Sequence, residues 1–448
     1  MKNIIGILRE GIDKHGEKRT AVTPVNAQQI IDWGYKLLVE PAIDPENGEI
    51  KRAFKDEDYV KAGAVIKNNL SEANVIFGLK EININKILPE KTYLFFSHTH
   101  KGQIKNRQLL KNLVENKATL IDYELIADNN NRRLITAFTY IAGSAGMVDT
   151  LWALGQKLNL KGIENPFANI TQSINVKNLV HIKDLLDKAG EKIKVEGTPE
   201  TIPPVICCIL GKGKTSTGAQ QILDMLPCEE ITLDKLSSVY AGGSRKKIYK
   251  LVLEVYDMYK LKEKYKKEFT GYNDNDKLNH YIKNPDMYES NMERILPFVT
   301  VLMNCIIWSN EYPRVLTNDL CKKNYSGNRT LLVIGDVTCD PNGSIEFSKE
   351  TWIDNPVYTY YPINETFKNG FESDGITVMA VTNLPCEFSV DASEKFSNEL
   401  RPFLKDIISA DYNGALSSSG LPEPIKNAAI MWKGIFTEKY KYMEEYIY

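Results

Sequence analysis

Residues that can move protons or bind carboxylates follow the apolar runs in the first third of the chain. Lys80 and Glu81 follow NVIFGL, and His98 follows TYLFFS. Further charged residues come after LIDY and in the loop behind the first apolar run, namely Glu124, Arg133 and Arg19. Lysine and histidine suit proton transfer near neutral pH, and the arginine fork matches a carboxylate. Each residue alone also fits an ordinary surface position, but their convergence favours a substrate with carboxylates and a titratable nitrogen.

A glycine-rich turn lies in the middle of the chain. GKGKTSTG (211–218) follows the apolar run PPVICCIL and precedes the helix-like AQQILDML. Glycine allows the backbone to approach a pyrophosphate, and a helix amino terminus directs free N–H groups at it. Gly211, Gly213 and Gly218 would form the turn, and Thr215 and Ser216 would add hydroxyl donors. Because the spacing departs from G-x-G-x-x-G, the turn alone fits a dinucleotide site and a structural turn equally well.

The residues after this turn bear on the choice between NAD and NADP. A dinucleotide fold needs an acid at the end of the next strand for the ribose hydroxyls. CEEITL (228–233) is the predicted next strand, with Glu230 or Asp234 near its end. The basic cluster 245–247 would meet a 2′-phosphate and favour NADP, although a solvated basic turn explains it as well.

The elements that must position these residues alternate between strand-like and helix-like segments. In the first part, strands are predicted at 3–8, 35–41, 73–80, 91–98 and 118–125, with helices at 24–34 and 57–64. Such alternation indicates a largely parallel sheet. Because ligands bind beyond the carboxyl ends of parallel strands, the charged residues above should meet at one edge.

The later part of the chain predicts a second unit of the same class. Helices are predicted at 139–158, 181–190 and 391–408, and buried strands at 203–210, 329–340 and 375–385. The charged, Tyr-rich stretch 245–290 is interpreted as a solvated helical excursion. We expect a substrate-binding domain at 1–138 and about 400–448, and a dinucleotide-binding domain at 139–399 with a helical insertion at about 240–315.

The composition limits the class of protein. The chain has 448 residues, a net charge of -2 and seven cysteines, two of them adjacent in a predicted buried strand. No strong charge of either sign favours nucleic acid or an acidic membrane, and no apolar run is long enough to span a bilayer. The irregular cysteines predict neither a disulfide framework nor a metal site. We expect a cytosolic protein without a metal.

The motifs together resemble a known enzyme family. LREGIDKHGEKRTAVTP, GLKE, FFSHTHKGQ, LIDYE and AGSAGM occur in this order, and GKGKTSTGAQ, LPCE, GDVTCD and NLPCEFSVDAS extend the similarity over nearly the whole chain. The chain resembles the lysine–2-oxoglutarate reductase portion of aminoadipic semialdehyde synthase. It is also similar to the fungal lysine-forming saccharopine dehydrogenases, and more distantly to alanine dehydrogenase and the transhydrogenase amino-terminal domain.

The resemblance implies two Rossmann-like, doubly wound domains with the active site in the cleft between them. It implies NADPH-dependent condensation of L-lysine with 2-oxoglutarate to saccharopine, with a separate glutamate-forming saccharopine dehydrogenase acting next. Lys80 and His98 match the catalytic residues, and Asp336 matches an acid facing the nicotinamide. The other matched residues comprise a substrate-binding set, Arg19, Glu81, Glu124 and Arg133, and a cofactor-binding set, Gly211, Gly213, Thr215, Ser216 and Gly218.

Three alternatives stay open at this point. The first is the NAD-dependent, lysine-forming saccharopine dehydrogenase of lysine biosynthesis. The second is the same chemistry on another amino acid, such as ornithine, because one methylene changes binding by only ~1–3 kcal/mol. The third is a catalytically inactive nucleotide-binding regulator on the same fold, which would bind a dinucleotide without turning over any substrate.

Overall fold

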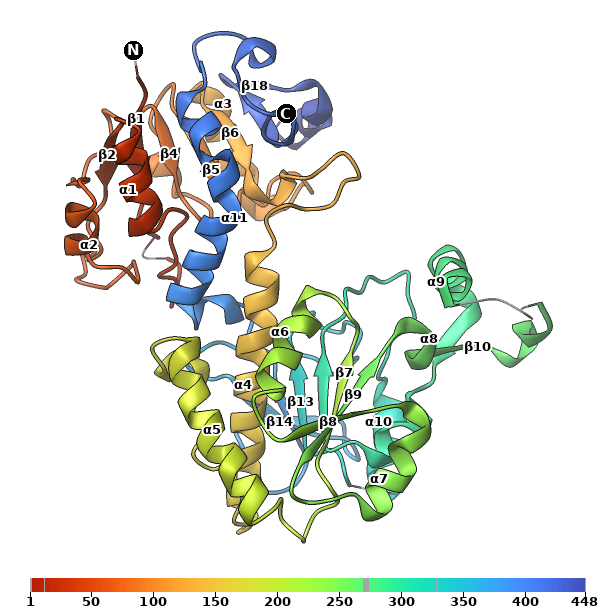
Figure 1. Cartoon of the computed structure of the whole chain (residues 1–448). Helices are drawn as coiled ribbons and strands as arrows, with labels where there is room; N and C mark the ends of the chain where they lie inside the picture. The colour runs from red at the N-terminus through yellow and green to blue at the C-terminus, as the bar shows by residue number, and fades with distance from the viewer. Residues whose placement is uncertain (1, 12, 269–273, 328, 448) are drawn as a thin grey trace. The chain divides into compact units, whose positions relative to one another are not determined.

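The chain divides into two compact units, each built around one sheet. A computed structural model describes residues 2–11, 13–268, 274–327 and 329–447. Unit 1 comprises Met1–Phe138 and Ser389–Tyr448, and unit 2 comprises Thr139–Phe388 (Figure 1). Within the described residues, each unit contains an eight-stranded sheet in which parallel pairing dominates. Two α/β units of the doubly wound class therefore confirm the predicted fold class.

The sheet of unit 1 places the carboxyl ends of its parallel strands at one edge. The strand order is β18-β17-β6-β5-β4-β1-β2-β3. The strands are β1 (Ile4–Ile7), β2 (Lys36–Val39), β3 (Val65–Ile66), β4 (Val75–Phe77), β5 (Thr92–Phe95), β6 (Thr119–Asp122), β17 (Ala429–Trp432) and β18 (Ile435–Phe436). The strands β1 to β6 pair in parallel, whereas β17 and β18 add antiparallel pairs beyond β6. Sequence patterns predicted five of these strands and missed β3, β17 and β18.

Helices flank this sheet and include a segment from the end of the chain. They are α1 (Pro24–Asp32), α2 (Asp56–Lys61), α3 (Arg107–Glu115), α11 (Ser389–Ser409) and α12 (Glu423–Asn427). Proline is the first residue of α1, where its fixed φ and missing N–H are tolerated. The Asn26 side-chain amide donates to the Ser397 carbonyl oxygen at 2.8 Å, which fastens α11 to α1. The carboxyl-terminal segment thus packs with the first sheet.

The sheet of unit 2 carries the glycine turn near its centre. Its order is β15-β14-β16-β13-β12-β7-β9-β8. The strands are β7 (Ile206–Leu210), β8 (Cys228–Ile231), β9 (Ile248–Leu253), β12 (Val301–Asn304), β13 (Val333–Asp336), β14 (Val357–Tyr361), β15 (Thr366–Asn369) and β16 (Ile376–Met379). The helices are α4 (Ala137–Leu160), α5 (Leu179–Val195), α6 (Lys214–Leu223), α7 (Leu236–Gly242), α8 (Val255–Met258), α9 (Asp274–Lys283) and α10 (Asn318–Gly327). Among the described strands of this sheet, β14 pairs antiparallel with β15 and with β16, and the other pairs are parallel.

The stretch expected to be a helical insertion contains strands as well as short helices. Two of its segments, β9 and β12, pair in parallel on either side of β7. A small antiparallel pair, β10 (Tyr259–Leu261) with β11 (Tyr288–Ser290), lies between them in sequence, and the part of this expectation at 269–273 lies outside the described residues. The charged residues of this stretch suggested a solvated helix, but Lys250 within β9 is buried and forms ion pairs with Asp224 and Glu230. Ion pairing of its one charged side chain lets this strand lie in the interior of the sheet.

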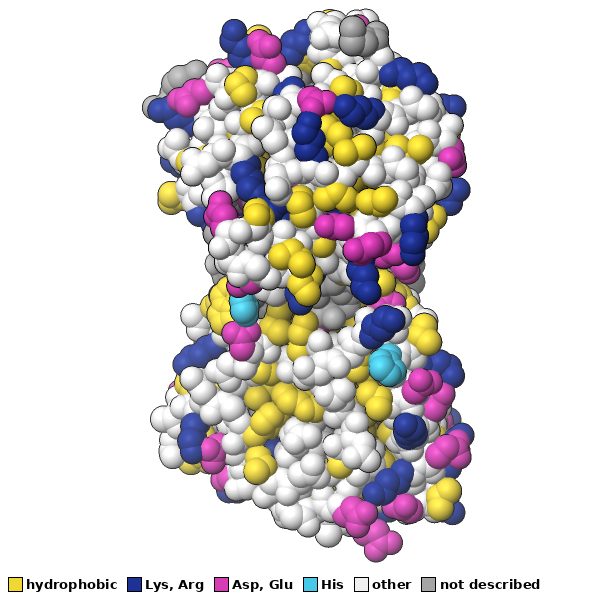
Figure 2. All heavy atoms as spheres, turned by 90° about the vertical axis from the view of Figure 1, so that its left-hand side faces the viewer, with side chains coloured by type: hydrophobic (Ala, Val, Ile, Leu, Met, Phe, Trp, Pro, Cys, Tyr) yellow, Lys and Arg dark blue, Asp and Glu magenta, His cyan; other side chains and the backbone are white. Residues whose placement is uncertain are grey.

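One face of the molecule shows no dominant charge. On the face drawn in Figure 2, acidic and basic side chains are interspersed in both units, and neither sign forms a continuous field. Among the described residues, no helix is long and apolar enough to cross a membrane. The same residues contain no group of three or more His, Cys, Asp and Glu side chains arranged to hold a metal ion.

Candidate functional site

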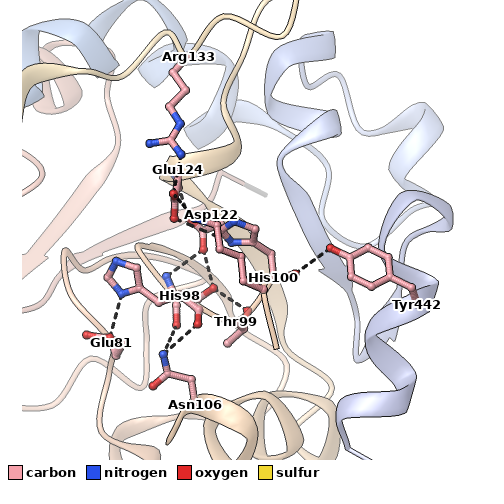
Figure 3. Close-up of polar contacts among 11 residues, drawn as sticks. Glu81, His98, Thr99, His100, Asn106, Asp122, Glu124, Arg133 and Tyr442 are labelled. Atoms are coloured by element: carbon pink, nitrogen blue, oxygen red, sulfur yellow. Dashed lines mark hydrogen bonds and ion pairs between the residues drawn. The ribbon is translucent and has the colours of Figure 1, made fainter. Parts of the chain in front are cut away.

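A lysine, a glutamate and a histidine meet where β4 and β5 end. Lys80 and Glu81 follow β4, and His98 follows β5, so the parallel pairing brings the two loops to one edge. The His98 ring nitrogen Nδ1 lies 2.9 Å from Glu81 Oε1 (Figure 3). Lys14 Nζ lies 3.2 Å from Glu81 Oε2. Burial opposes ionisation of Glu81, but His98 and Lys14 outweigh it and hold the Glu81 pKa well below its usual range. Glu81 is therefore an anion that orients His98.

Lys80 lies in an environment that favours its neutral amine. The side chain is half-buried, and no carboxylate oxygen among the described residues lies within ion-pair distance of its ammonium. Burial lowers the pKa of Lys80, and the positive charge of Arg19 lowers it further, against the opposing charges of nearby carboxylates. Its backbone is fixed because the buried Glu10 carboxylate accepts from the N–H groups of Leu79 at 3.1 Å and Lys80 at 3.2 Å. A lysine whose pKa is lowered from its ordinary value can act as a base.

The backbone of His98 is held in a strained conformation by residues that the sequence did not indicate. Its φ is 48°, in the left-handed region that non-glycine residues rarely adopt. The Asn106 amide donates to the carbonyl oxygens of Ser97 at 3.2 Å and His98 at 3.0 Å. Asp122 Oδ2 accepts from Ser97 N at 2.9 Å and Ser97 Oγ at 2.5 Å. Such strain persists only where neighbouring contacts impose it, and it is common at functional sites.

A second ionic cluster surrounds Glu124 at the end of β6. Arg133 Nη2 lies 2.6 Å from Glu124 Oε1, and Lys101 Nζ lies 3.6 Å from the same oxygen. His100 Nδ1 lies 3.9 Å from Glu124 Oε2. Asp122 joins the two clusters, because its Oδ1 accepts from Glu124 N at 2.8 Å while its other oxygen holds Ser97 (Figure 3). The structure thus brings Glu124 and Arg133 together, and places His100 beside Glu124 rather than Glu81.

Arg19 is committed to an internal partner. Its Nε lies 2.7 Å from Glu17 Oε1 and its Nη2 lies 2.5 Å from Glu17 Oε2, with both side chains about 1% exposed. The guanidinium also stacks over Phe138, 4.2 Å from the ring centre. A buried, bidentate arginine acts on its surroundings through its charge, and here that charge reaches Lys80.

The glycine turn connects β7 directly to α6. Gly211 has a φ of 89°, and its N–H donates to the Leu253 carbonyl oxygen at 2.8 Å. Gly213 caps the amino end of α6, and a Cβ built on it would meet nothing within 4 Å. The space beside Gly213 is therefore open, and the first N–H groups of α6, which have no partner within the helix, are the donors that a pyrophosphate needs. The geometry fits the phosphates of a dinucleotide.

Other residues of the predicted turn lie in the packing between α4 and α6. Ser216 is fully buried, and its Oγ accepts from the Gln220 amide at 3.0 Å, whereas Thr215 is half-buried. A Cβ on Gly218 would lie 2.0 Å from the Tyr140 carbonyl oxygen. Gly218 is thus required by the close approach of two helices.

These contacts predict different outcomes for two glycine substitutions. Gly218→Ala should destabilise the protein by about 1–3 kcal/mol, because the added methyl group overpacks the helix contact. Gly213→Ala should leave the free energy of unfolding within about 0.5 kcal/mol but weaken dinucleotide binding about tenfold or more, because the methyl group enters the space that phosphate needs. Denaturant unfolding measures the stability of the two variants, and calorimetry measures their dinucleotide binding. Equal losses of stability in the two variants would contradict the different roles given to Gly213 and Gly218.

Asp336 ends β13 within a buried polar network. The Asn304 amide donates to its Oδ1 at 2.7 Å, and the Ser348 hydroxyl donates to its Oδ2. Burial raises the pKa of Asp336, and these hydrogen bonds oppose the shift. Both carboxylate oxygens of Asp336 therefore accept hydrogen bonds, one from the end of β12 and one from the loop that follows β13. These bonds hold Asp336 at the carboxyl edge of the sheet, where it was expected.

The predicted positions of the ribose acid and the basic cluster require correction. Because β9 lies between β7 and β8, Glu230 within β8 and Asp234 after it belong to a strand that does not neighbour the glycine turn. The residue after the neighbouring strand β9 is Glu254, which forms an ion pair with Lys212 inside the turn. The basic cluster 245–247 precedes β9 and therefore lies at the opposite end of the strand from the turn. It cannot meet a ligand bound at the turn.

Two models of one protein family match the chain. The model described as alanine dehydrogenase/PNT, N-terminal domain, matches residues 6–145. The model described as alanine dehydrogenase/PNT, C-terminal domain, matches residues 276–439. The first covers the strands that carry Lys80, Glu81 and His98.

Several proteins are similar along the chain. Alpha-aminoadipic semialdehyde synthase of Arabidopsis thaliana is 34% identical over 98% of this chain and 41% of its own length. The mitochondrial protein of the same name from Bos taurus is 30% identical over 99% of this chain and 48% of its own length. Saccharopine dehydrogenase [NAD(+), L-lysine-forming] of Neurospora crassa is 26% identical over 87% of this chain and 88% of its own length. The chain thus spans less than half of the two synthases.

Solved structures share the fold. An L-alanine dehydrogenase superposes with a TM-score of 0.62 at 18% identity, covering 99% of this chain and 98% of that chain. A transhydrogenase from Sinorhizobium meliloti superposes with a TM-score of 0.57 at 12% identity, covering 97% of this chain and all of that chain.

Proposed function

Because the chain belongs to the alanine dehydrogenase/PNT family, we propose that it is an oxidoreductase that condenses the ε-amine of L-lysine with the keto carbon of 2-oxoglutarate and reduces the imine to saccharopine. The names of the similar synthases and saccharopine dehydrogenases support this substrate class. The observation that carries the proposal is that the half-buried Lys80 lies at the same edge of the sheet as His98, whose ring Glu81 orients.

The residues of unit 1 divide the proton transfers of imine formation. The ε-amine of lysine must lose a proton before it attacks the keto carbon, and Lys80 is the base because its pKa is lowered. The carbinolamine hydroxyl must then gain a proton and leave as water. His98 is the acid for this step, because Glu81 engages Nδ1 and leaves Nε2 as the nitrogen that exchanges a proton with substrate.

The arginines divide into two roles. Arg133 is exposed, and an exposed ion pair such as the one it forms with Glu124 contributes only ~0–1 kcal/mol to stability. A substrate carboxylate can therefore take the place of Glu124 at Arg133. Glu124 then becomes available to the lysine α-amine. Arg19 does not reach substrate in this account, because Glu17 holds its guanidinium, and it acts on Lys80 through charge.

A nicotinamide dinucleotide would be held at the glycine turn of unit 2. Gly211 and Gly213 would admit the pyrophosphate, with the first N–H groups of α6 as donors. The bound cofactor supplies the hydride that reduces the imine. A separate glutamate-forming saccharopine dehydrogenase would consume the product.

The test is oxidation of reduced dinucleotide at 340 nm by the purified chain. We expect turnover only when L-lysine and 2-oxoglutarate are both present, and a loss of at least about tenfold in kcat/KM when ornithine replaces lysine. The rate with saccharopine and oxidised dinucleotide measures the reaction in the lysine-forming direction. Dinucleotide binding without turnover of either pair would instead support a nucleotide-binding regulator.

A further inference from the structure

Two carboxyl side chains are buried together in unit 2 without a positive charge. Asp149 of α4 is fully buried, and Glu387, in the segment that follows β16, is 4% exposed. Burial raises the pKa of both groups, each carboxyl acts on the other, and no cation is among the main influences on either pKa. A carboxylate is costly to bury without a cation, and two adjacent carboxylates cost more than one. The fold therefore favours a pair that keeps a proton.

The packing on α4 brings the two side chains to one place. A Cβ on Gly146 of α4 would lie 3.3 Å from Leu384 Cδ1, so the turn that begins at Leu384 packs on this face of the helix. Asp149 lies three residues beyond Gly146, and Glu387 lies three residues beyond Leu384. Residues three apart share one face of a helical turn. The segment 384–388 thus meets α4 through an apolar contact and, one turn further on, through the two carboxyls.

Three of the four carboxyl oxygens lack a donor. Asp149 Oδ1 accepts from Ser173 N at 2.7 Å and from Ser173 Oγ at 2.6 Å. Asp149 Oδ2 and both oxygens of Glu387 are buried and have no hydrogen-bond partner among the residues that the structure describes. The amide of Gln172, which lies near Glu387, donates instead to the Ile353 carbonyl oxygen at 2.9 Å. One proton held between the carboxyls would satisfy an oxygen of each, in a bond stronger than one between neutral groups.

We propose that Asp149 and Glu387 share one proton, that this bond holds residues 384–388 against α4, and that loss of the proton at alkaline pH releases them. Ser173 fixes Asp149, so the part that moves on ionisation is the segment that carries Glu387. Glu387 lies two residues before Ser389, where the chain passes from unit 2 into unit 1. The carboxyl pair therefore controls a connecting segment, and the inference does not depend on the proposed reaction.

The shared proton makes the folded protein less stable as the pH rises. In the unfolded chain both carboxyls ionise near about pH 4, whereas burial keeps a proton on the folded pair to higher pH. The folded state then binds more protons than the unfolded state, so the free energy of unfolding falls with pH until the pair loses its last proton. The neighbouring groups that act on the pair are Ser173, the Gln172 amide and the backbone N–H of Ile174, and none of them titrates in this range.

The experiment follows thermal unfolding of the purified full-length chain and of Glu387→Gln from about pH 5 to about pH 9. Glutamine cannot ionise, and its amide can donate to Asp149 in place of the shared proton. We expect the Tm of the wild-type chain to fall by about 3 °C or more relative to Glu387→Gln over this range, so that the variant is the more stable protein at alkaline pH. Glu164→Gln removes an exposed carboxylate of the same unit, paired with Lys192, and should keep the wild-type pH profile.

A second measurement uses the wild-type chain alone. Amide hydrogen exchange of residues 384–388 should accelerate between neutral and alkaline pH by more than the chemical rate of exchange does, which reports local opening. Parallel pH profiles of Tm in the wild-type chain and Glu387→Gln would overturn the inference. If that variant does not fold, unchanged protection of residues 384–388 in the wild-type chain would overturn it. A rise in wild-type Tm on adding K⁺ or Ca²⁺ at alkaline pH, absent in Glu387→Gln, would replace the proton by a bound cation and also overturn it.

Discussion

Replacing Lys80 with methionine should lower kcat by about 10²–10⁴-fold, the usual contribution of a positioned base. Methionine preserves the length and apolar stem of the side chain but cannot accept a proton from the attacking amine. In the wild-type protein the rate should rise with pH as Lys80 loses its proton, over a range below that of an ordinary lysine, because burial and Arg19 lower its pKa. In Lys80→Met this rise should disappear. Steady-state rates across pH measure both effects.

A second lysine provides the matched control. Lys91 also has a pKa lowered by burial, but it precedes β5 and so lies at the opposite end of the strand from His98. Lys91→Met should retain kcat within about twofold, and both variants should bind the dinucleotide as the wild-type protein does. Equal losses in the two variants, or a Lys80→Met enzyme with wild-type turnover, would refute the assignment of the base.

Replacing His98 with glutamine should lower kcat by about 10²-fold or more, again with little change in dinucleotide binding. Glutamine can still hydrogen-bond Glu81 but cannot donate a proton to the departing hydroxyl and recover it. The loss should therefore fall on kcat rather than on the Kd of the cofactor. Rapid-mixing kinetics with both substrates, followed at 340 nm, check whether reduction itself is slowed.

The neighbouring histidine tests the choice of acid. His100 lies beside Glu124 rather than Glu81, and Tyr442 donates to its backbone carbonyl at 2.9 Å. His100→Gln should lower kcat less than about tenfold, because His100 lies in the ionic cluster around Glu124 and is not the proton donor of the reaction. If His100→Gln is the more damaging of the two, the roles given to these histidines are reversed.

Local sequence patterns were sufficient for the strands that position Lys80 and His98. VIF and TYLF are short apolar runs that are fully buried, and such runs between turn residues indicate interior strands. The polar residues behind them were predicted to meet because parallel strands share a carboxyl edge, and Glu81 does bind His98. The prediction was wrong at β9, because the charge of Lys250 suggested a solvated helix where the structure has a buried strand. The ion pair of Lys250 with Asp224, which makes its burial possible, is visible only in the folded structure.

The supporting contacts could not be predicted from the sequence. Asp122 and Asn106 hold the loop of His98 through side-chain contacts that depend on how three loops pack. Arg19 was assigned to substrate because its type suits carboxylates, but Glu17, two residues away, engages it. The sequence also could not show which strand neighbours the glycine turn, since β8, the next strand along the chain, lies at the sheet edge beyond β9.

The most direct test of the central claim is to follow the nitrogen of lysine into product. L-Lysine labelled with ¹⁵N at the ε-position is incubated with 2-oxoglutarate, the reduced dinucleotide and the purified chain, and the products are identified by mass spectrometry. The account predicts one condensed product that contains both carbon skeletons and retains ¹⁵N in the new secondary amine. Oxidation of the dinucleotide with ¹⁵N appearing in glutamate, or with no condensed product, would contradict it.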